Sequence, residues 1–221
     1  MSWEHVVAHV LLPSAVAAAA GFGAWRCWGL LRYGRDPRLV KLMWFYGLFA
    51  ASLVSVAIWT GQLDWAADSV AGGMHASNSS GAHGDLHGSF AGAERINFFL
   101  LAHHVLMLAS LGVAVQAFGH RRAEGATVAA VGLAFFAPFI PVVLAIEAAM
   151  TLYLAVQAIL NHMERRSPGA LQVAAGFFLF FLGHLGFFVF HQAGGARVPL
   201  GDVFALVGIV LLVQLLPRRS T

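Results

Sequence analysis

Residues 170–190 read ALQVAAGFFLFFLGHLGFFVF. This stretch carries no charged side chain, and its apolar residues are continuous rather than alternating, so it predicts a helix and not a strand of a membrane barrel. A helix rises about 1.5 Å per residue, and about 20 apolar residues cross the hydrocarbon core of a bilayer. The stretch therefore has the length and character of one membrane-spanning helix.

The whole chain has the same character. Its 221 residues are 59% hydrophobic and only 10% charged, whereas soluble domains carry roughly 25% charged residues. The length favours one compact bundle over two domains. The N-terminus lacks a basic region and a clear cleavage site, so we expect the first helix to be retained. The sequence thus predicts an all-α, multi-pass bundle over residues 1–221, in contact with the lipid of a cell membrane, for which we expect a prokaryotic plasma membrane.

The apolar runs predict about seven transmembrane helices. Their expected bounds are about 4–31, 41–63, 95–118, 126–140, 142–163, 170–192 and 199–217. The fourth and fifth share one apolar run that lies between Arg121-Arg122 and Arg165-Arg166, so the chain must cross twice if both pairs face the same side. Pro138 and Pro141 are the expected breakers of that run. Residues 64–94, rich in Gly, Ser and His, are expected to form a flexible outer loop.

The basic residues orient this bundle. Arg95 and Arg197 are expected on one side, and all the others on the opposite side: Arg26, Arg32, Arg35, Arg38, Lys41, Arg121, Arg122, Arg165, Arg166, Arg218 and Arg219. Because cytoplasmic loops carry the excess of Lys and Arg, the N-terminus is expected outside and the C-terminus inside. The formal charge of +3 then reflects topology and contact with anionic lipid headgroups, and no nucleic-acid partner is expected.

The histidines suggest where the chemistry lies, since ionisable residues inside a membrane are costly and often functional. Most of the eleven histidines fall outside or in the outer half of the predicted helices. Counting 1.5 Å per residue places His9, His103 and His184 roughly 10 Å below the outer surface, and Glu147 reaches the same level. His103 and His104 diverge by about 100° on their helix, so only one of them is expected to share a site with His184.

Spacing within single helices indicates further metal-ligand pairs. His5 and His9 are four residues apart and share a helix face, so they could hold one ion. His184 and His191 are seven residues apart, on one face but two turns from each other. They could serve two sites, or one site and its entrance.

The first hypothesis for this layer is a b-type haem, with axial histidines from facing helices. The expected ligands are His104 and His184, with His9 next, and Glu147 would tune the potential or accept a proton. Such a cytochrome would exchange electrons with an outer donor or with quinol. Small and aromatic residues would line the pocket, although close helix packing is the alternative for the glycines and lipid contact the favoured explanation for most of the phenylalanines. These residues include Gly183, Gly186, Phe177, Phe178, Phe180, Phe181, Phe187 and Phe188.

Two other hypotheses stay open. A zinc or copper site could serve metal handling or membrane lipid hydrolysis, with ligands from His5, His9, His104, His184 and His191. In helix count the chain resembles the alkaline ceramidases and adiponectin receptors, seven-helix zinc enzymes, but residues 199–217 lack their His-x-x-x-His pair. The third hypothesis is an accessory or transport subunit of a larger membrane complex, with Glu147, Tyr153 and Gln157 as a polar track. In that case the histidines could simply bond neighbouring helices.

Overall fold

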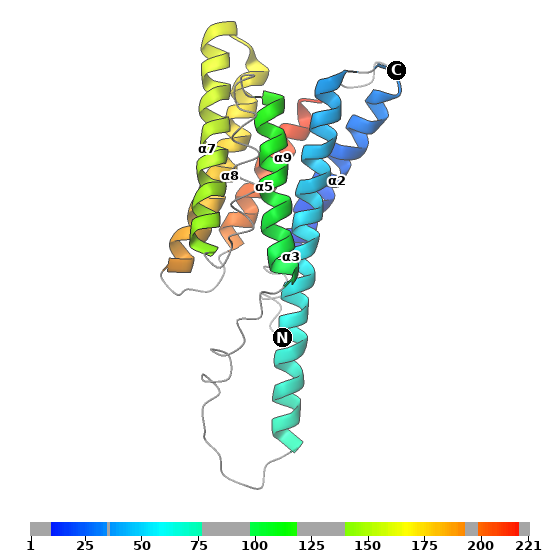
Figure 1. The fold of residues 1–221 in the computed structure, drawn as a ribbon, viewed down its shortest axis with the longest axis vertical. Helices are drawn as coiled ribbons and strands as arrows, with labels where there is room; N and C mark the ends of the chain where they lie inside the picture. The colour runs from blue at the N-terminus through cyan, green and yellow to red at the C-terminus, as the bar shows by residue number, and fades with distance from the viewer. Residues whose placement is uncertain (1–9, 35, 77–97, 119–139, 193–198, 217–221) are drawn as a thin grey trace.

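The computed structural model describes residues 10–34, 36–76, 98–118, 140–192 and 199–216 (Figure 1). These residues form helices and short connections, and none of them lies in a strand. The helices are α2 (Leu12–Leu31), α3 (Pro37–Ala76), α5 (Phe98–Phe118), α7 (Ile140–Arg165), α8 (Pro168–Gln192) and α9 (Pro199–Gln214). Stretches of α3, α5, α7 and α8 are long and apolar enough to cross a membrane, and α9 holds a shorter apolar stretch. The prediction of an all-helical fold is confirmed.

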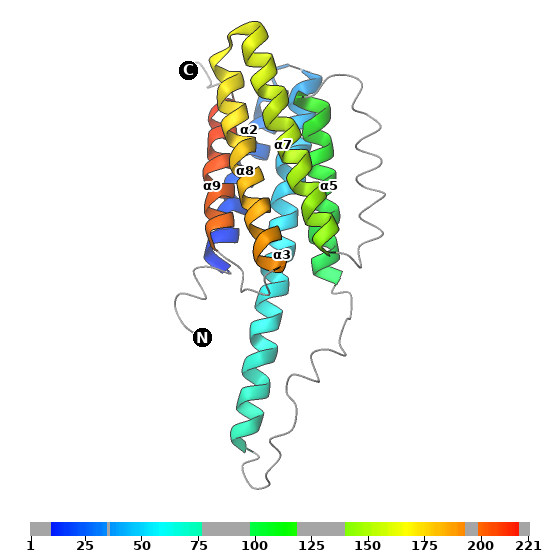
Figure 2. The same cartoon turned by 90° about the vertical axis from the view of Figure 1, so that its left-hand side faces the viewer.

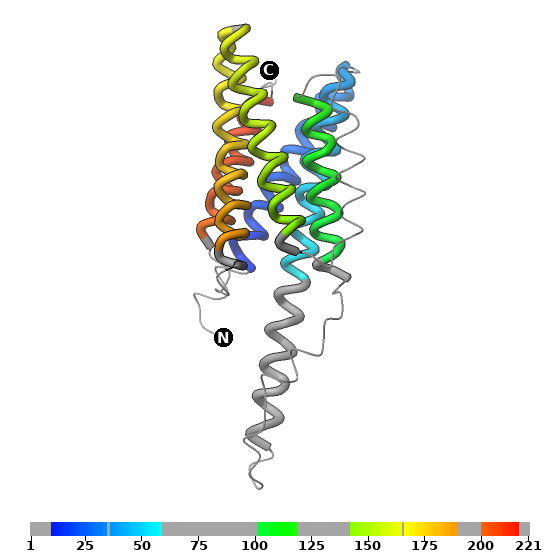
Figure 3. Tube along the Cα trace, turned by 60° about the vertical axis from the view of Figure 1, so that its left-hand side comes forward, coloured from blue at the N-terminus to red at the C-terminus, as the bar shows by residue number. Residues whose placement is uncertain are grey.

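The helices form a closed ring. Each makes its main contacts with two neighbours, in the order α2, α3, α5, α7, α8, α9 and back to α2. Figures 2 and 3 show this bundle from two further sides, and in Figure 2 α3 projects beyond the other helices. Neighbours in the ring are thus mostly neighbours in the order of the chain, as is usual for packed elements.

An aromatic core lies inside the ring, nearer to one end of the bundle. It consists of five phenylalanines from α3, α5 and α8: Phe45, Phe49, Phe118, Phe177 and Phe180. The Phe49 and Phe180 ring centroids are 5.1 Å apart, and those of Phe45 and Phe177 are 5.9 Å apart. These tilted contacts avoid the unfavourable face-to-face arrangement of aromatic pairs. They join α3 to α8 across the ring.

The basic residues that the structure describes lie towards the end of the bundle that is nearer to this aromatic core. Arg32 and Arg38 flank the α2–α3 connection, and Arg166 lies in the α7–α8 turn at the same end of the bundle (Figure 1). Two basic side chains also bind carbonyls near helix C-termini, where cations are favoured. Lys41 Nζ donates to Gln116 O of α5 (3.2 Å), and Arg26 donates to the Val213 and Leu216 carbonyls at the end of α9 (3.4 and 3.1 Å). We call this end the basic end.

The helix α3 corrects the predicted outer loop. It continues to Ala76, so the prediction of a flexible loop at 64–94 is wrong for residues 64–76, while 77–94 lie outside the described residues. No proline occurs between Pro37 and Pro138 to stop the helix. The pair Gly72-Gly73 costs only about 1 kcal/mol per residue relative to alanine, which lowers helix stability without ending the helix.

The region between α5 and α7 also differs from the prediction. Pro141 is the second residue of α7, where proline is tolerated because its missing N–H has no partner in the first turn. Pro141 therefore lies in the first turn of α7 and not in a loop between two helices. The predicted helix 126–140 lies almost entirely outside the described residues. However, α5 and α7 run in the same direction, so Phe118 and Ile140 lie at opposite ends of the bundle (Figure 2).

The remaining bounds differ by a few residues. The helix α9 ends at Gln214 rather than 217, because the amides of Leu215 and Leu216 turn back to the carbonyls three residues earlier. The helix α7 begins before residue 142 and ends after residue 163, and α8 begins before residue 170. The two helices meet in a tight turn at residues 166–167. The start of the first predicted helix, before residue 10, lies outside the described residues.

Glycines set the packing of α8 against α9. A Cβ added at Gly183 would lie 3.0 Å from the backbone oxygen of Gly201, and one added at Gly208 would lie 2.8 Å from that of Gly176. The two helices therefore approach with backbone against backbone, as small residues allow in membranes. Helix packing thus accounts for Gly183, whereas an added Cβ at Gly186 would meet open space.

The α7–α8 turn supplies a stability prediction. Arg166 has φ 48°, a left-handed conformation in which only glycine is free of strain. Its amide donates to His162 O (2.7 Å), and His162 Nδ1 donates to Ser167 O (2.7 Å), so the turn is held although Arg166 is strained. We expect Arg166→Gly to raise the free energy of unfolding by about 1 kcal/mol, measured by denaturation in mixed micelles. Arg165→Gly, in the helix itself, should lower it by a similar amount; equal effects of the two would contradict this account.

A buried His–Glu–His cluster as candidate functional site

Three of the predicted site residues meet inside the ring. His104 of α5 and His184 of α8 both contact the Glu147 carboxylate of α7: His104 Nδ1 lies 3.1 Å from Oε1, and His184 Nε2 lies 3.4 Å from Oε2. The side chains are buried, with relative exposures of 5% for His104, 1% for Glu147 and 7% for His184. We call these residues the His–Glu–His cluster.

The helix directions explain why these residues share one level. His104 is six residues into α5 and Glu147 is seven residues into α7, which places each about 10 Å along its helix. Both helices start at the end opposite the basic end. The helix α8 runs the other way and finishes there, and His184 lies eight residues, about 12 Å, before its last residue. The level expected from residue counts is therefore the level at which the side chains meet.

The hydrogen bonds assign the proton positions in His184. Its Nδ1 lies 2.8 Å from the carbonyl oxygen of Phe180, which can only accept, so Nδ1 carries a hydrogen. A neutral imidazole has one N–H, and its other nitrogen is an acceptor. If His184 is neutral, a bare Nε2 faces Glu147 Oε2, which is also an acceptor when the carboxylate is ionised.

Two facing acceptors in a buried site are unfavourable unless a cation lies between them. One proton resolves the conflict, whether it resides on Nε2 or on Oε2. The cluster then has no net charge, because His104 can donate from Nδ1 to Oε1 while remaining neutral. Without that proton the cluster carries a buried negative charge, which is costly within a membrane. The arrangement is therefore chemically suited to hold one exchangeable cation.

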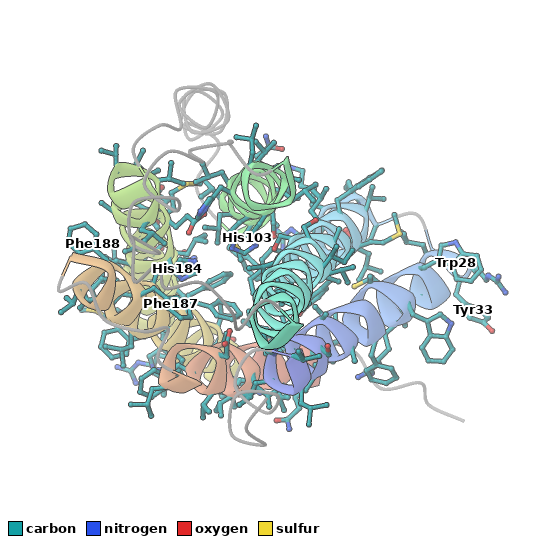
Figure 4. All side chains as sticks on the ribbon, turned by 90° about the horizontal axis from the view of Figure 1, so that it is seen from below. Trp28, Tyr33, His103, His184, Phe187 and Phe188 are labelled. Atoms are coloured by element: carbon teal, nitrogen blue, oxygen red, sulfur yellow. The ribbon has the colours of Figure 1, made fainter. Side chains whose placement is uncertain are left out.

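His103 contacts a different helix. Its Nδ1 donates to Ser52 O of α3 (2.9 Å), and its ring centroid lies 5.0 Å from that of His104. Figure 4 shows His103 and His184 from the end opposite the basic end. The expectation that adjacent histidines diverge, with only one of them sharing a site with His184, agrees with this geometry.

Residues around the cluster complete its setting. Thr151, one turn after Glu147, donates its hydroxyl to the backbone carbonyls of Glu147 and Ala148 (3.0 and 2.9 Å). The sequence prediction did not include Thr151, although residues four apart on a helix lie on the same face, which could have pointed to it. Phe180, one turn from His184 towards the basic end, belongs to the aromatic core and is fully buried. The next turn of α8 from His184 towards the basic end is thus packed among aromatic rings.

The other predicted residues are not joined to the cluster by what the structure describes. His5 and His9 lie outside the described residues, and His191 lies in α8 at a position whose side chain is not described. The proposed polar track is interrupted, because Glu147 is buried while Tyr153 is 38% exposed. Within the described part of the chain, no three His, Cys, Asp or Glu side chains are grouped to hold a metal ion.

The geometry also bears on a haem between His104 and His184. A haem iron takes axial ligands from opposite faces of a flat macrocycle, but here both imidazoles contact one carboxylate, which occupies the space between them. Binding of haem by this pair would require Glu147 to leave. The contact of Glu147 Oε2 with His184 Nε2 fits one proton between the two atoms. Comparison of the chain with protein-family models, curated proteins and solved structures found no match.

Proposed function

We propose that this chain is a seven-span protein of a cell membrane, with the N-terminus outside and the basic end inside, whose His–Glu–His cluster binds and releases a proton. It would serve as the proton-exchanging subunit of a membrane complex that couples proton transfer to transport or electron transfer. The observation that carries the proposal is the contact of Glu147 Oε2 with His184 Nε2, two acceptors that need a cation between them.

The seven spans are supported by the helix directions. The helices α5 and α7 run the same way (Figure 2), so α5 ends at the end of the bundle opposite to the one at which α7 begins. The clustering of Arg32, Arg38 and Arg166 at one end supports the orientation through the excess of basic residues on the inner side.

The aromatic core supports access from one side only. On α8, Phe180 and Phe177 lie between His184 and the basic end, and both are fully buried. Proton transfer needs a chain of polar groups or water, and packed phenyl rings supply neither. We therefore propose that the cluster exchanges its proton with the outer side and does not conduct protons across the bundle.

Infrared difference spectroscopy on oriented vesicles tests this function. A pH change on the outer side is expected to alter the carboxyl absorption of Glu147, and a change on the basic side should leave it unaltered. The signal should be absent in Glu147→Gln and retained in Glu164→Gln, a control at an exposed acid near the basic end. A response to the basic side, or an unchanged signal in Glu147→Gln, would contradict the proposal.

A metal centre is the second candidate, and one distance favours it. Two ligands about 2.0–2.1 Å from one tetrahedral ion lie about 3.3 Å apart, close to the 3.4 Å between Glu147 Oε2 and His184 Nε2. Zinc or copper would need further ligands, for which the sequence offers His5, His9 and His191. Elemental analysis of the purified protein tests this candidate, and an optical spectrum of protein made with ample haem tests the b-type cytochrome. Stoichiometric metal or a Soret band would replace the proton-binding proposal.

A further inference from the structure

A hollow lies on the outer surface of α2, near the basic end and far from the His–Glu–His cluster. It has a volume of about 400 Å³ and is lined by Phe22, Trp25, Arg26, Trp28, Gly29, Leu30 and Arg32. Gly29 contributes no side chain, so the aromatic residues on either side form the walls. Figure 4 shows Trp28 and Tyr33 pointing away from the bundle. The hollow therefore faces the surroundings of the protein and not its interior.

Aromatic side chains give this surface an interfacial character. Trp25, Trp28 and Phe22 are each about half exposed or more, at 60%, 48% and 50%. Tryptophan is enriched where a membrane meets water, because its ring is apolar and its N–H is polar. The position of these residues, next to the basic end, places the hollow at the depth of lipid headgroups and the first acyl carbons.

Two arginines give the hollow a positive charge. The Arg32 guanidinium stacks on the Trp28 ring, 4.0 Å from its centroid, which restrains a long side chain that would otherwise be mobile. Arg26 is anchored by its bonds to the α9 carbonyls. A stacked guanidinium keeps its N–H edge available for a bidentate contact with phosphate.

We propose that this hollow binds one anionic phospholipid, with its phosphate on Arg32 and the start of an acyl chain against Trp25 and Phe22. The charge selects an anionic headgroup, and the aromatic walls select a lipid over free phosphate. The site is separate from the proton-binding cluster, so it requires only that the chain spans a membrane.

Quenching of tryptophan fluorescence by brominated lipids tests the site. The full chain would carry phenylalanine at Trp3, Trp44, Trp59 and Trp65, so that only Trp25 and Trp28 report. In phosphatidylcholine vesicles, brominated phosphatidylglycerol is expected to associate about fivefold more strongly than brominated phosphatidylcholine, the selectivity that one arginine near the surface supplies. Arg32→Gln should bring that ratio close to one, and Trp28→Leu, which removes the stacking contact but keeps the charge, should lower it partly.

Arg38→Gln is the matched control, because Arg38 is exposed at the same end but does not line the hollow. It should keep the preference for phosphatidylglycerol. Equal quenching by the two lipids in the reporter protein, or the same loss of preference in both arginine variants, would overturn the proposal in favour of general surface charge. An absence of quenching by either lipid would overturn it too, since the hollow would then be covered by protein.

Discussion

Glu147→Ala is expected to lower the free energy of unfolding by about 3–5 kcal/mol, the range found when one partner of a buried ion pair is removed. His104 Nδ1 and His184 Nε2 would both lose their partner in a buried site, and the shortened side chain would leave a cavity. Equilibrium unfolding in mixed micelles, followed by circular dichroism, measures the change.

Glu147→Gln separates stability from proton binding. A glutamine can accept from His104 Nδ1 through its oxygen and donate to His184 Nε2 through its amide nitrogen. Both contacts of residue 147 with the imidazoles are then kept while both imidazoles are neutral, so this variant should stay within about 1 kcal/mol of the wild type. If Glu147→Gln destabilised the protein as much as Glu147→Ala, the hydrogen-bond pattern assigned to the cluster would be incorrect.

Gly208→Leu is expected to destabilise the bundle by about 3 kcal/mol, at the upper end of the usual range for overpacking. A Cβ at this position already lies 2.8 Å from the backbone oxygen of Gly176, and a backbone atom cannot move aside as a flexible side chain can. The helices α8 and α9 must therefore separate, and Phe180, which borders both Gly208 and the aromatic core, would lose packing. The same unfolding experiment measures the loss.

Gly47→Ala is the matched control for Gly208→Leu. An added Cβ at Gly47 would meet nothing within 4 Å, and alanine favours a helix over glycine by up to about 1 kcal/mol. This variant should be neutral or stabilising. A destabilisation of similar size at both glycines would indicate a general intolerance to substitution rather than close contact between α8 and α9.

The sequence predicts the main features of the site because depth along a helix follows from residue counts. His104, Glu147 and His184 were expected at one level, and they meet there. The direct contacts of Glu147 with both imidazoles were not predictable, because they depend on how α5, α7 and α8 are rotated in the ring. The tautomer of His184 could not be predicted from the sequence either, because it depends on a hydrogen bond to the carbonyl of Phe180 one turn away.

The errors of the sequence prediction have local physical causes. The end of α3 was placed before residue 64 because glycine and serine follow, yet Gly72-Gly73 only weakens a helix that has no proline to stop it. Gly183 was considered as space for a flat cofactor, but the backbone of α9 fills that space. The case of Gly183 shows that a glycine in a sequence does not reveal which neighbour fills the space that it leaves.

The nitrogen NMR signal of His184 Nε2 tests the central claim most directly. In protein labelled with ¹⁵N-histidine, the Nε2 signal of the wild type is expected to move towards the protonated form when the cluster takes up its proton on acidification. In Glu147→Gln the same nitrogen should remain a neutral acceptor under the same change. A signal that does not change with pH in the wild type, or that changes identically in Glu147→Gln, would contradict a proton shared between Glu147 and His184.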